Sequence, residues 1–167
     1  LVLSCHLSRA RAVKSGDASC PETYCFLSLA EFRKFHALSH NHLAFDLPFV
    51  FNFDWGGESD NVRMIDSLDQ QTEALRRAAE FEKTGQYGFL IQEFIPSANR
   101  SLRVVVIGTK RIAYWRVQPD IKIFSTGVSK GAILDSSSDP PLQKAGVEMV
   151  DRFCDLTRIN LAGFDIL

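Results

Sequence analysis

Hydrophobic residues in the middle of the chain form two short runs that are typical of β-strands. Residues 89–95 are mostly apolar and are followed by Pro96, which predicts a largely buried strand that ends there. Residues 102–107 are rich in β-branched side chains, and a turn at 108–110 leads into a further strand that ends near Arg116. The pattern therefore predicts a hairpin that follows a buried strand.

Further extended segments are predicted nearer the two ends of the chain. Residues 47–55 carry large apolar side chains at alternating positions and run into a pair of glycines. Residues 159–167 are typical of a strand that bears a single carboxylate, Asp165. The segment 20–26 is predicted to be extended, because Pro21 disfavours a helical conformation in the residue before it.

Apolar residues at helical spacing predict three helices, over 28–38, over 67–83 and beyond residue 140. Ser28 is expected to cap the first of them, with Glu31 at the third helical position completing a capping box. The inner side of the second helix is predicted to consist of Leu68, Leu75, Ala78, Ala79 and Glu82. Strands and helices in this mixed order predict an α+β fold.

Composition and charge narrow the function classes. Of the 167 residues, 46% are hydrophobic and 23% are charged, as in a soluble globular protein. The net charge of −1 predicts no broad contact with nucleic acid or with an anionic membrane. Four cysteines without a CxxC pair are most simply the reduced thiols of a cytoplasmic protein. We therefore expect a cytoplasmic protein without nucleic-acid or membrane partners.

Several polar residues lie within the apolar runs. Gln92 and Glu93 fall inside a predicted buried strand, which is costly unless they face a cleft or find hydrogen-bond partners. Arg103, Arg116 and Asp165 lie on three separate strands, each between apolar neighbours. Such charges are expensive unless they offset one another or a ligand, so we expect the three side chains to converge on one site.

Four motifs, taken in order, resemble those of a known family. The Gln-Glu-Phe-Ile run at 92–95 and the Leu-Arg-Val-Val-Val run at 102–106 resemble the hinge and the following strand of ATP-grasp ligases. The closest pattern is that of the RimK-like branch, to which the Pro-Glu-Thr run at 21–23 is also similar. Gly-Phe-Asp at 163–165 resembles the segment that supplies a metal-binding aspartate in this family.

The resemblance implies an α+β ATP-grasp fold in which two lobes clasp a nucleotide cleft. Residues 20–91 would form the small lobe with its glycine loop. Residues 92–167 would form the second lobe, truncated before its last metal-binding strand. Residues 1–19 would be a helical remnant of a preceding region, so that the fold is incomplete at both ends.

The implied activity is that of an ATP- and Mg-dependent ligase. Such an enzyme joins a carboxylate to an amine through an acyl phosphate, and a peptide or an amino acid would suit as one of the two substrates. Magnesium and positioned cations would neutralise the charge that develops on the transferred phosphoryl group. The expected cofactors are therefore ATP and Mg.

The resemblance also implies a role for each candidate site residue. Arg103 and Arg116 would be the catalytic cations, and Asp165 would bind the magnesium that bridges the ATP phosphates. The residues implied to bind the nucleotide are Asn52, Gly56, Gly57, Glu58, Gln92, Glu93, Phe94, Ile95, Ser101 and Lys130. Simpler interpretations stay open, because Gly56 and Gly57 also suit an ordinary hairpin turn and Lys130 an ordinary surface loop.

Four departures separate the sequence from the family pattern. Asn52 stands in place of a phosphate-binding lysine, Ser59 in place of a later loop glycine, and Ser101 in place of a common ribose-binding aspartate. The chain also stops at Leu167, before the Glu-x-Asn pair of magnesium ligands, so activity is expected to be impaired in this fragment. The alternatives are a degenerate non-catalytic nucleotide-binding or scaffold domain, and an α+β interaction domain without a nucleotide site.

Overall fold

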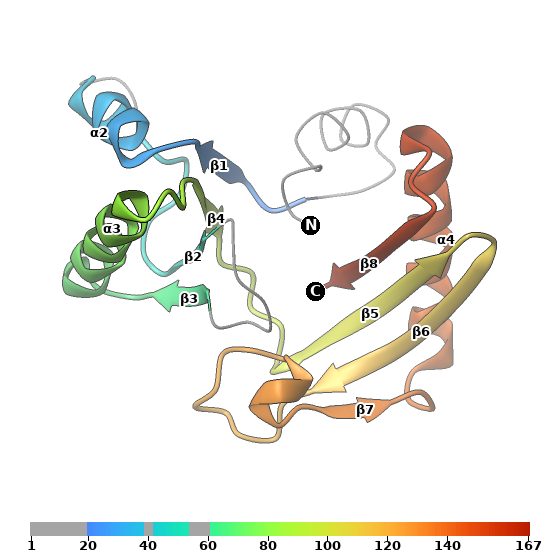
Figure 1. Ribbon diagram of the computed structural model, residues 1–167. Coiled ribbons are helices and arrows are strands. Elements are labelled where there is room, and N and C mark those ends of the chain that lie inside the picture. The colour runs from blue at the N-terminus through green and yellow to red at the C-terminus, as the bar shows by residue number, and fades with distance from the viewer. Residues whose placement is uncertain (1–19, 39–41, 54–60) are drawn as a thin grey trace. The chain divides into compact units, whose positions relative to one another are not determined.

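The computed structural model describes residues 20–38, 42–53 and 61–167 (Figure 1). Within these residues the chain divides into two compact units, Pro21–Ile95 and Pro96–Leu167. The N-terminal segment 1–19, for which a helix was predicted, lies outside the described residues.

The unit Pro21–Ile95 is a four-stranded antiparallel sheet in the order β1-β4-β2-β3, covered on one side by two helices (Figure 1). The sheet and its helices are β1 (Thr23–Phe26), α2 (Leu29–Ala37), β2 (Phe49–Phe53), β3 (Val62–Ile65), α3 (Leu68–Lys83) and β4 (Phe89–Glu93). Strand β4 pairs with β1 on one side and with β2 on the other, so the last strand of the unit is a central strand of the sheet.

Large apolar side chains on β2 and β4 form the core of this unit. In β2 the side chains of Phe49, Phe51 and Phe53 are buried, whereas those of Val50 and Asn52 are half-exposed. The rings of Phe51 and Phe89 stack with their centroids 4.7 Å apart. The alternation confirms that Asn52 shares a face with Val50, because successive strand residues point to opposite sides of a sheet.

Both helices of this unit begin at serine caps. The Ser28 hydroxyl accepts a hydrogen bond from the Glu31 N–H at 3.2 Å, and the Ser67 hydroxyl accepts one from Gln70 at 3.4 Å. The Glu31 carboxylate accepts its return bond from the N–H of Leu27 rather than from that of Ser28. Ser28 therefore caps the helix as predicted. The return bond to the Glu31 carboxylate comes from Leu27, one residue before the cap.

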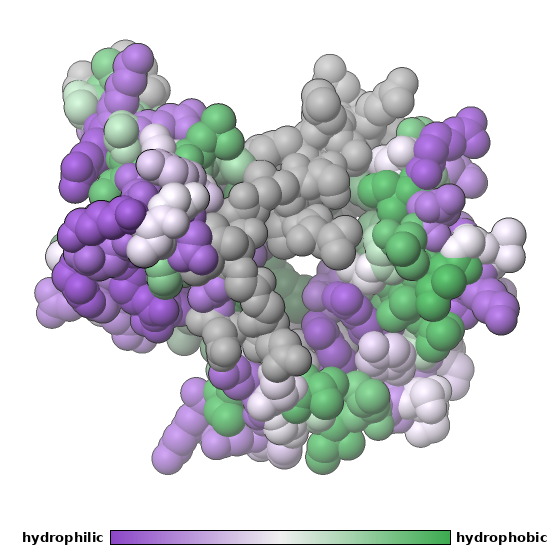
Figure 2. Space-filling view, in the orientation of Figure 1, coloured by the Kyte–Doolittle hydropathy of each residue, from purple (hydrophilic) through white to green (hydrophobic). Residues whose placement is uncertain are grey.

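The buried side of α3 differs in part from the prediction. Ala74 and Ala78 are buried, and Leu75 and Ala79 pack against the same core. Leu68 was predicted to face inward, but it is 70% exposed at the first helical position. The rest of the surface of α3 is largely hydrophilic, as Figure 2 shows. No helix among the described residues is long and apolar enough to cross a membrane.

The unit Pro96–Leu167 is a second four-stranded antiparallel sheet, in the order β7-β6-β5-β8. Its elements are β5 (Arg100–Ile107), β6 (Lys110–Val117), a 3-10 turn η1 (Val128–Lys130), β7 (Ile133–Asp135), α4 (Pro140–Thr157) and β8 (Leu161–Ile166). The predicted hairpin is confirmed, and Gly108 adopts a positive φ of 59° at its turn. One face of the sheet packs against α4 through Leu102, Val104 and Val106.

The strand β4 is shorter than predicted. It ends at Glu93, so Phe94 and Ile95 follow the strand instead of belonging to it. The neighbouring strands explain the difference, because the last pairs of β4 are Gln92 with Thr23 and Glu93 with Phe49, where β1 and β2 begin. The two compact units meet along the chain between Ile95 and Pro96.

Candidate functional site

A charged cluster lies on the face of the second sheet that is turned away from α4. Alternation along β5 sends Leu102 and Val104 toward α4 and Arg103 to the opposite face. The pairing register sets Arg103 opposite Asp165 on β8 and Ser101 opposite Arg116 on β6. Three strands thus deliver the four residues to one place.

Both arginines bond to the same carboxylate. Arg103 Nη1 lies 2.8 Å from Asp165 Oδ2, and Arg116 Nη2 donates to Asp165 Oδ1. The side chains of Arg103, Arg116 and Asp165 are 28%, 18% and 44% exposed, so the group is reached by solvent from the Asp165 side. Two guanidinium groups and one carboxylate leave one positive charge in excess, which favours an anionic ligand.

The buried hydroxyl of Ser101 accepts a hydrogen bond from one arginine of this cluster. Its side chain is 1% exposed, and its hydroxyl lies 2.8 Å from the Thr126 hydroxyl and 3.3 Å from Arg116 Nη2. Ser101 therefore contacts a catalytic candidate directly, whereas the resemblance implied that it binds the nucleotide. Arg116 Nε is buried and has no hydrogen-bond partner in the described part of the chain, so the guanidinium keeps one unused donor.

Gln118 orders the loop that carries Lys130, and sequence reasoning did not single it out. It is 3% exposed, and its Nε2 donates to the carbonyl groups of Ser125 at 3.1 Å and Lys130 at 3.0 Å. Its Oε1 accepts from the N–H of Asp120. The sequence signal that could have identified Gln118 is its place between an aromatic strand and a proline, since a buried amide there must find backbone partners. The Lys130 side chain is at the exposed end of this loop.

The polar residues at the end of β4 find partners within their own unit. Gln92 Nε2 donates to the Thr23 hydroxyl at 2.8 Å, and Glu93 Oε2 accepts from the N–H of Glu22 at 3.2 Å. The backbone N–H of Glu93 donates to the Glu22 carbonyl at 2.8 Å. These bonds account for polar groups inside an apolar strand without a ligand. Asn52 lies on the helix-free face of the same sheet.

Three of the predicted nucleotide-binding residues, Gly56, Gly57 and Glu58, lie outside the described residues. The structure therefore does not describe the predicted glycine turn.

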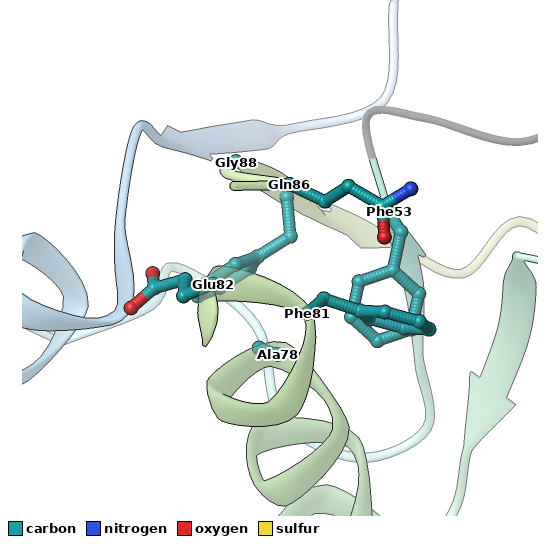
Figure 3. A pocket seen from close by; sticks show the side chains of 7 residues that line it. Phe53, Ala78, Phe81, Glu82, Gln86 and Gly88 are labelled. Carbon is teal, nitrogen blue, oxygen red and sulfur yellow. The ribbon is translucent and has the colours of Figure 1, made fainter. Parts of the chain in front are cut away.

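A small pocket in the unit Pro21–Ile95 is separate from all the predicted site residues. It lies between the end of α3 and strands β2 and β4, and its volume is about 160 Å³ including open solvent (Figure 3). Its lining residues are Phe53, Ala78, Phe81, Glu82, Gln86, Gly88 and Phe89. The pocket encloses no room even for a water molecule, so it cannot hold a nucleotide.

The described residues can supply only part of a metal site. Among them, no three His, Cys, Asp or Glu side chains lie close enough together to hold an ion. Magnesium, however, is commonly bound by one or two carboxylates together with phosphate oxygens and water. Asp165 fits that requirement as a single protein ligand, and the two arginines beside it fit the phosphates.

Comparisons with known proteins give structural matches only. No protein-family model matches the sequence. No curated protein gives a significant match. Solved structures do match along almost the whole chain.

The D-alanine–D-alanine ligase of Bacillus anthracis superposes with a TM-score of 0.61 and 15% identity, over 95% of this chain and 50% of that one. An ATP-grasp RimK domain protein from Sphaerobacter thermophilus superposes with a TM-score of 0.51 and 17% identity, over 95% of this chain and 51% of that one. The ADP complex of N5-carboxyaminoimidazole ribonucleotide synthetase superposes with a TM-score of 0.54 and 10% identity, over 90% of this chain and 37% of that one.

At these identities the likeness concerns the fold. This chain spans 37–51% of the length of the three structures. The protein therefore has an α+β fold with two antiparallel sheets that matches part of the ATP-grasp ligase structures.

Proposed function

We propose that this chain is the nucleotide-binding part of an ATP- and Mg-dependent ligase that joins a carboxylate to an amine through an acyl phosphate. The supporting observation is the pair of arginines that meet at Asp165 within a fold matching ATP-grasp ligases. The RimK-like pattern of the motifs makes a peptide or an amino acid the favoured class of substrate.

In this proposal Arg103 and Arg116 bind the phosphate oxygens of ATP and stay bound while charge moves onto them. Their positions are set in advance by strand pairing and by Ser101, so little reorganisation is needed when the phosphoryl group is transferred. The unused N–H of Arg116 Nε is a further donor that a small shift of the side chain would make available.

Asp165 would hold magnesium, which would supply positive charge that neutralises the phosphates. Each oxygen of the Asp165 carboxylate accepts one guanidinium bond, which leaves lone pairs for a metal while both arginines stay in place. The remaining N–H groups of the arginines would then meet the phosphates. Metal binding and phosphate binding should therefore strengthen each other.

Residues of the other unit are proposed to bind the remainder of the nucleotide. The backbone of residues 92–94 and the side chain of Ile95 would contact adenine, since the side chains of Gln92 and Glu93 already bond to neighbouring groups. Asn52 and the glycine turn with Glu58 would contact phosphates, as would Lys130 of the unit Pro96–Leu167.

Isothermal calorimetry with ATP and Mg²⁺ tests the proposal. Loss of one charge-assisted hydrogen bond costs roughly 1.5–3 kcal/mol, so Arg103→Ala and Arg116→Ala should each weaken binding about tenfold to hundredfold. Arg76→Ala is the matched control, because Arg76 pairs with Glu73 on the exposed side of α3. Wild-type affinity in both site variants would contradict the proposal, as would the absence of nucleotide binding.

A non-catalytic nucleotide-binding or scaffold domain is the second candidate, and Asn52 in place of a lysine favours it. The two candidates differ in their use of metal. A ligase requires magnesium at Asp165, so Mg²⁺ should strengthen ATP binding in the wild type and not in Asp165→Asn. Affinity that is independent of Mg²⁺ in both proteins would favour the scaffold.

A further inference from the structure

The side chain of Arg103 reaches Asp165 by crossing strand β8 directly above Gly163. Gly163 and Asp165 are two residues apart on β8 and share a face. A Cβ placed on Gly163 would lie 2.1 Å from Arg103 Nη2, 2.4 Å from Cζ and 2.7 Å from Nε. Three atoms of one guanidinium group thus occupy the space that any other side chain at position 163 would need.

The backbone does not explain the glycine. Gly163 lies in the middle of β8 and is not among the residues with positive φ. Glycine inside a strand weakens it and commonly marks a place where another group approaches closely. Here that group is the Arg103 guanidinium, and its approach is the only use of the missing Cβ at this position that the described residues reveal.

Gly146 on α4 provides the contrast. A Cβ on Gly146 would lie 2.5 Å from Leu102 Cδ2 and 3.2 Å from Ile166 Cδ1, on the other face of the same sheet. Both glycines thus relieve a close contact. At Gly146 the contact is with the hydrophobic core, and at Gly163 it is with the charged cluster.

We propose that Gly163 is a positioning residue that lets the Arg103 guanidinium lie flat on β8, where it can serve an anionic phosphate group. The inference rests on the proposed function, because Arg103 is the group that would contact the ligand. Apolar and polar heavy atoms normally approach no closer than about 3 Å, so any side chain at 163 lifts the guanidinium by roughly 1 Å. The guanidinium is the free end of a flexible side chain, so the lift changes its position with little loss of stability.

The test compares Gly163→Ala with Gly146→Ala in the full chain. With ATP and Mg²⁺ as the probe, Gly163→Ala should bind roughly tenfold more weakly, as for one lost charge-assisted hydrogen bond, with a melting temperature near that of the wild type. Gly146→Ala should melt at a lower temperature and bind as the wild type does, because it disturbs the core instead. A Gly163→Ala protein that melts early and binds normally would overturn the inference.

A double variant separates positioning from a general structural effect. In an Arg103→Ala background, Gly163→Ala should weaken binding no further, because the displaced group is already gone. Additive losses would mean that Gly163 acts on something other than Arg103, and would overturn the inference.

A spectroscopic measurement makes the test independent of the ligand. The Nε–Hε resonance of Arg103, assigned by its loss in Arg103→Ala, should shift in Gly163→Ala and stay in place in Gly146→Ala. An unmoved resonance in Gly163→Ala overturns the inference even if the protein binds ATP. A shifted resonance together with equal ATP binding by the wild type and Arg103→Ala would uphold the positioning of Arg103 and contradict the proposed function instead.

Discussion

At the scale of single residues, the candidate site depends on which charges share a partner. Asp165 accepts bonds from both Arg103 and Arg116, and Arg116 also bonds to the buried hydroxyl of Ser101. Each guanidinium is therefore held in place before any ligand arrives. An arrangement of this kind orients two cations toward solvent while one carboxylate offsets half of their charge.

The substitution Asn52→Lys should strengthen binding of ATP with Mg²⁺. A charge-assisted hydrogen bond is worth roughly 1.5–3 kcal/mol against about 1 kcal/mol for a neutral one, so the gain should be about threefold to thirtyfold in calorimetry. The prediction requires Asn52 to lie on the helix-free face of its sheet, and it does, together with Val50.

Val50→Lys is the matched control for this substitution, since Val50 lies on the same face and the same strand, two residues away. It adds the same charge, so a comparable gain from both variants would reflect general attraction of the nucleotide. Equal or weaker affinity in Asn52→Lys would mean that Asn52 does not occupy the place of the phosphate-binding lysine.

At the scale of elements, short polar turns decide where helices and strands meet. The segment between β7 and α4 is an example, because Asp135 Oδ1 accepts bonds from the Ser137 N–H at 2.8 Å, the Ser137 hydroxyl at 2.8 Å and the Ser138 N–H at 3.1 Å. Trp115 Nε1 donates to the Ser138 carbonyl at 2.9 Å, which ties the same turn to β6. The turn therefore sets the start of α4 against the sheet that carries the arginines.

The pKa of the Asp135 carboxyl should lie well below its usual range. The hydrogen bonds from the Ser138 hydroxyl, and then from the N–H and the hydroxyl of Ser137, favour the charged form. Because the folded-state pKa is depressed, the stability that this group contributes is fully present above the ordinary aspartate value of about 3.9. It is lost progressively as the pH falls from that value through the lower, folded-state pKa.

An NMR titration of the Asp135 carboxyl carbon measures this shift directly. Ser137→Ala and Ser138→Ala should each raise the pKa toward the ordinary value, because each removes a hydroxyl donor to the carboxylate. A wild-type carboxyl that titrates at about 3.9 would show that the turn is not closed in solution.

At the scale of the whole molecule, each compact unit has its own hydrophobic core. In Pro21–Ile95 the core is built largely from phenylalanine rings, including Phe51 and Phe89. In Pro96–Leu167 it is built from aliphatic residues of β5 and α4 around Trp115. The charged cluster lies on the second of these, on the sheet face opposite its core.

Phe51→Ala should destabilise the unit Pro21–Ile95 selectively. Phe51 is 0% exposed, and a Phe→Ala change in a core costs about 3–5 kcal/mol. Residue-resolved hydrogen exchange should therefore accelerate most within 21–95. Val104→Ala, at an equally buried position of the other unit, should accelerate exchange mainly within 96–167. Equal acceleration along the whole chain in both variants would mean that the two cores unfold together.

The sequence by itself determined most of the elements, because their signals are local, but it did not predict the short strands β3 and β7. Alternation of apolar residues marked β2, an apolar run with a single carboxylate marked β8, helical spacing and a serine marked α3, and Gly108 marked the hairpin turn. The same local signals placed polar residues within strands, which made them site candidates. They misplaced Leu68 and the end of β4, since the exposure of a first helical turn and the last partner of a strand depend on neighbours distant in sequence.

The sequence predicted that Arg103, Arg116 and Asp165 converge, and the structure confirms it. Only the tertiary structure decided which elements pair and which atoms of these side chains meet. The strand orders β1-β4-β2-β3 and β7-β6-β5-β8 are not neighbour-to-neighbour sequences along the chain. Arg103 and Asp165 are 62 residues apart and come together only because β8 pairs with β5 in a register that sets them opposite each other. The position of Gln118 carried a local signal, but its partners Ser125 and Lys130 are known only from the structure. The space above Gly163 has no signature in sequence, because it is defined by a contact with Arg103 on another strand.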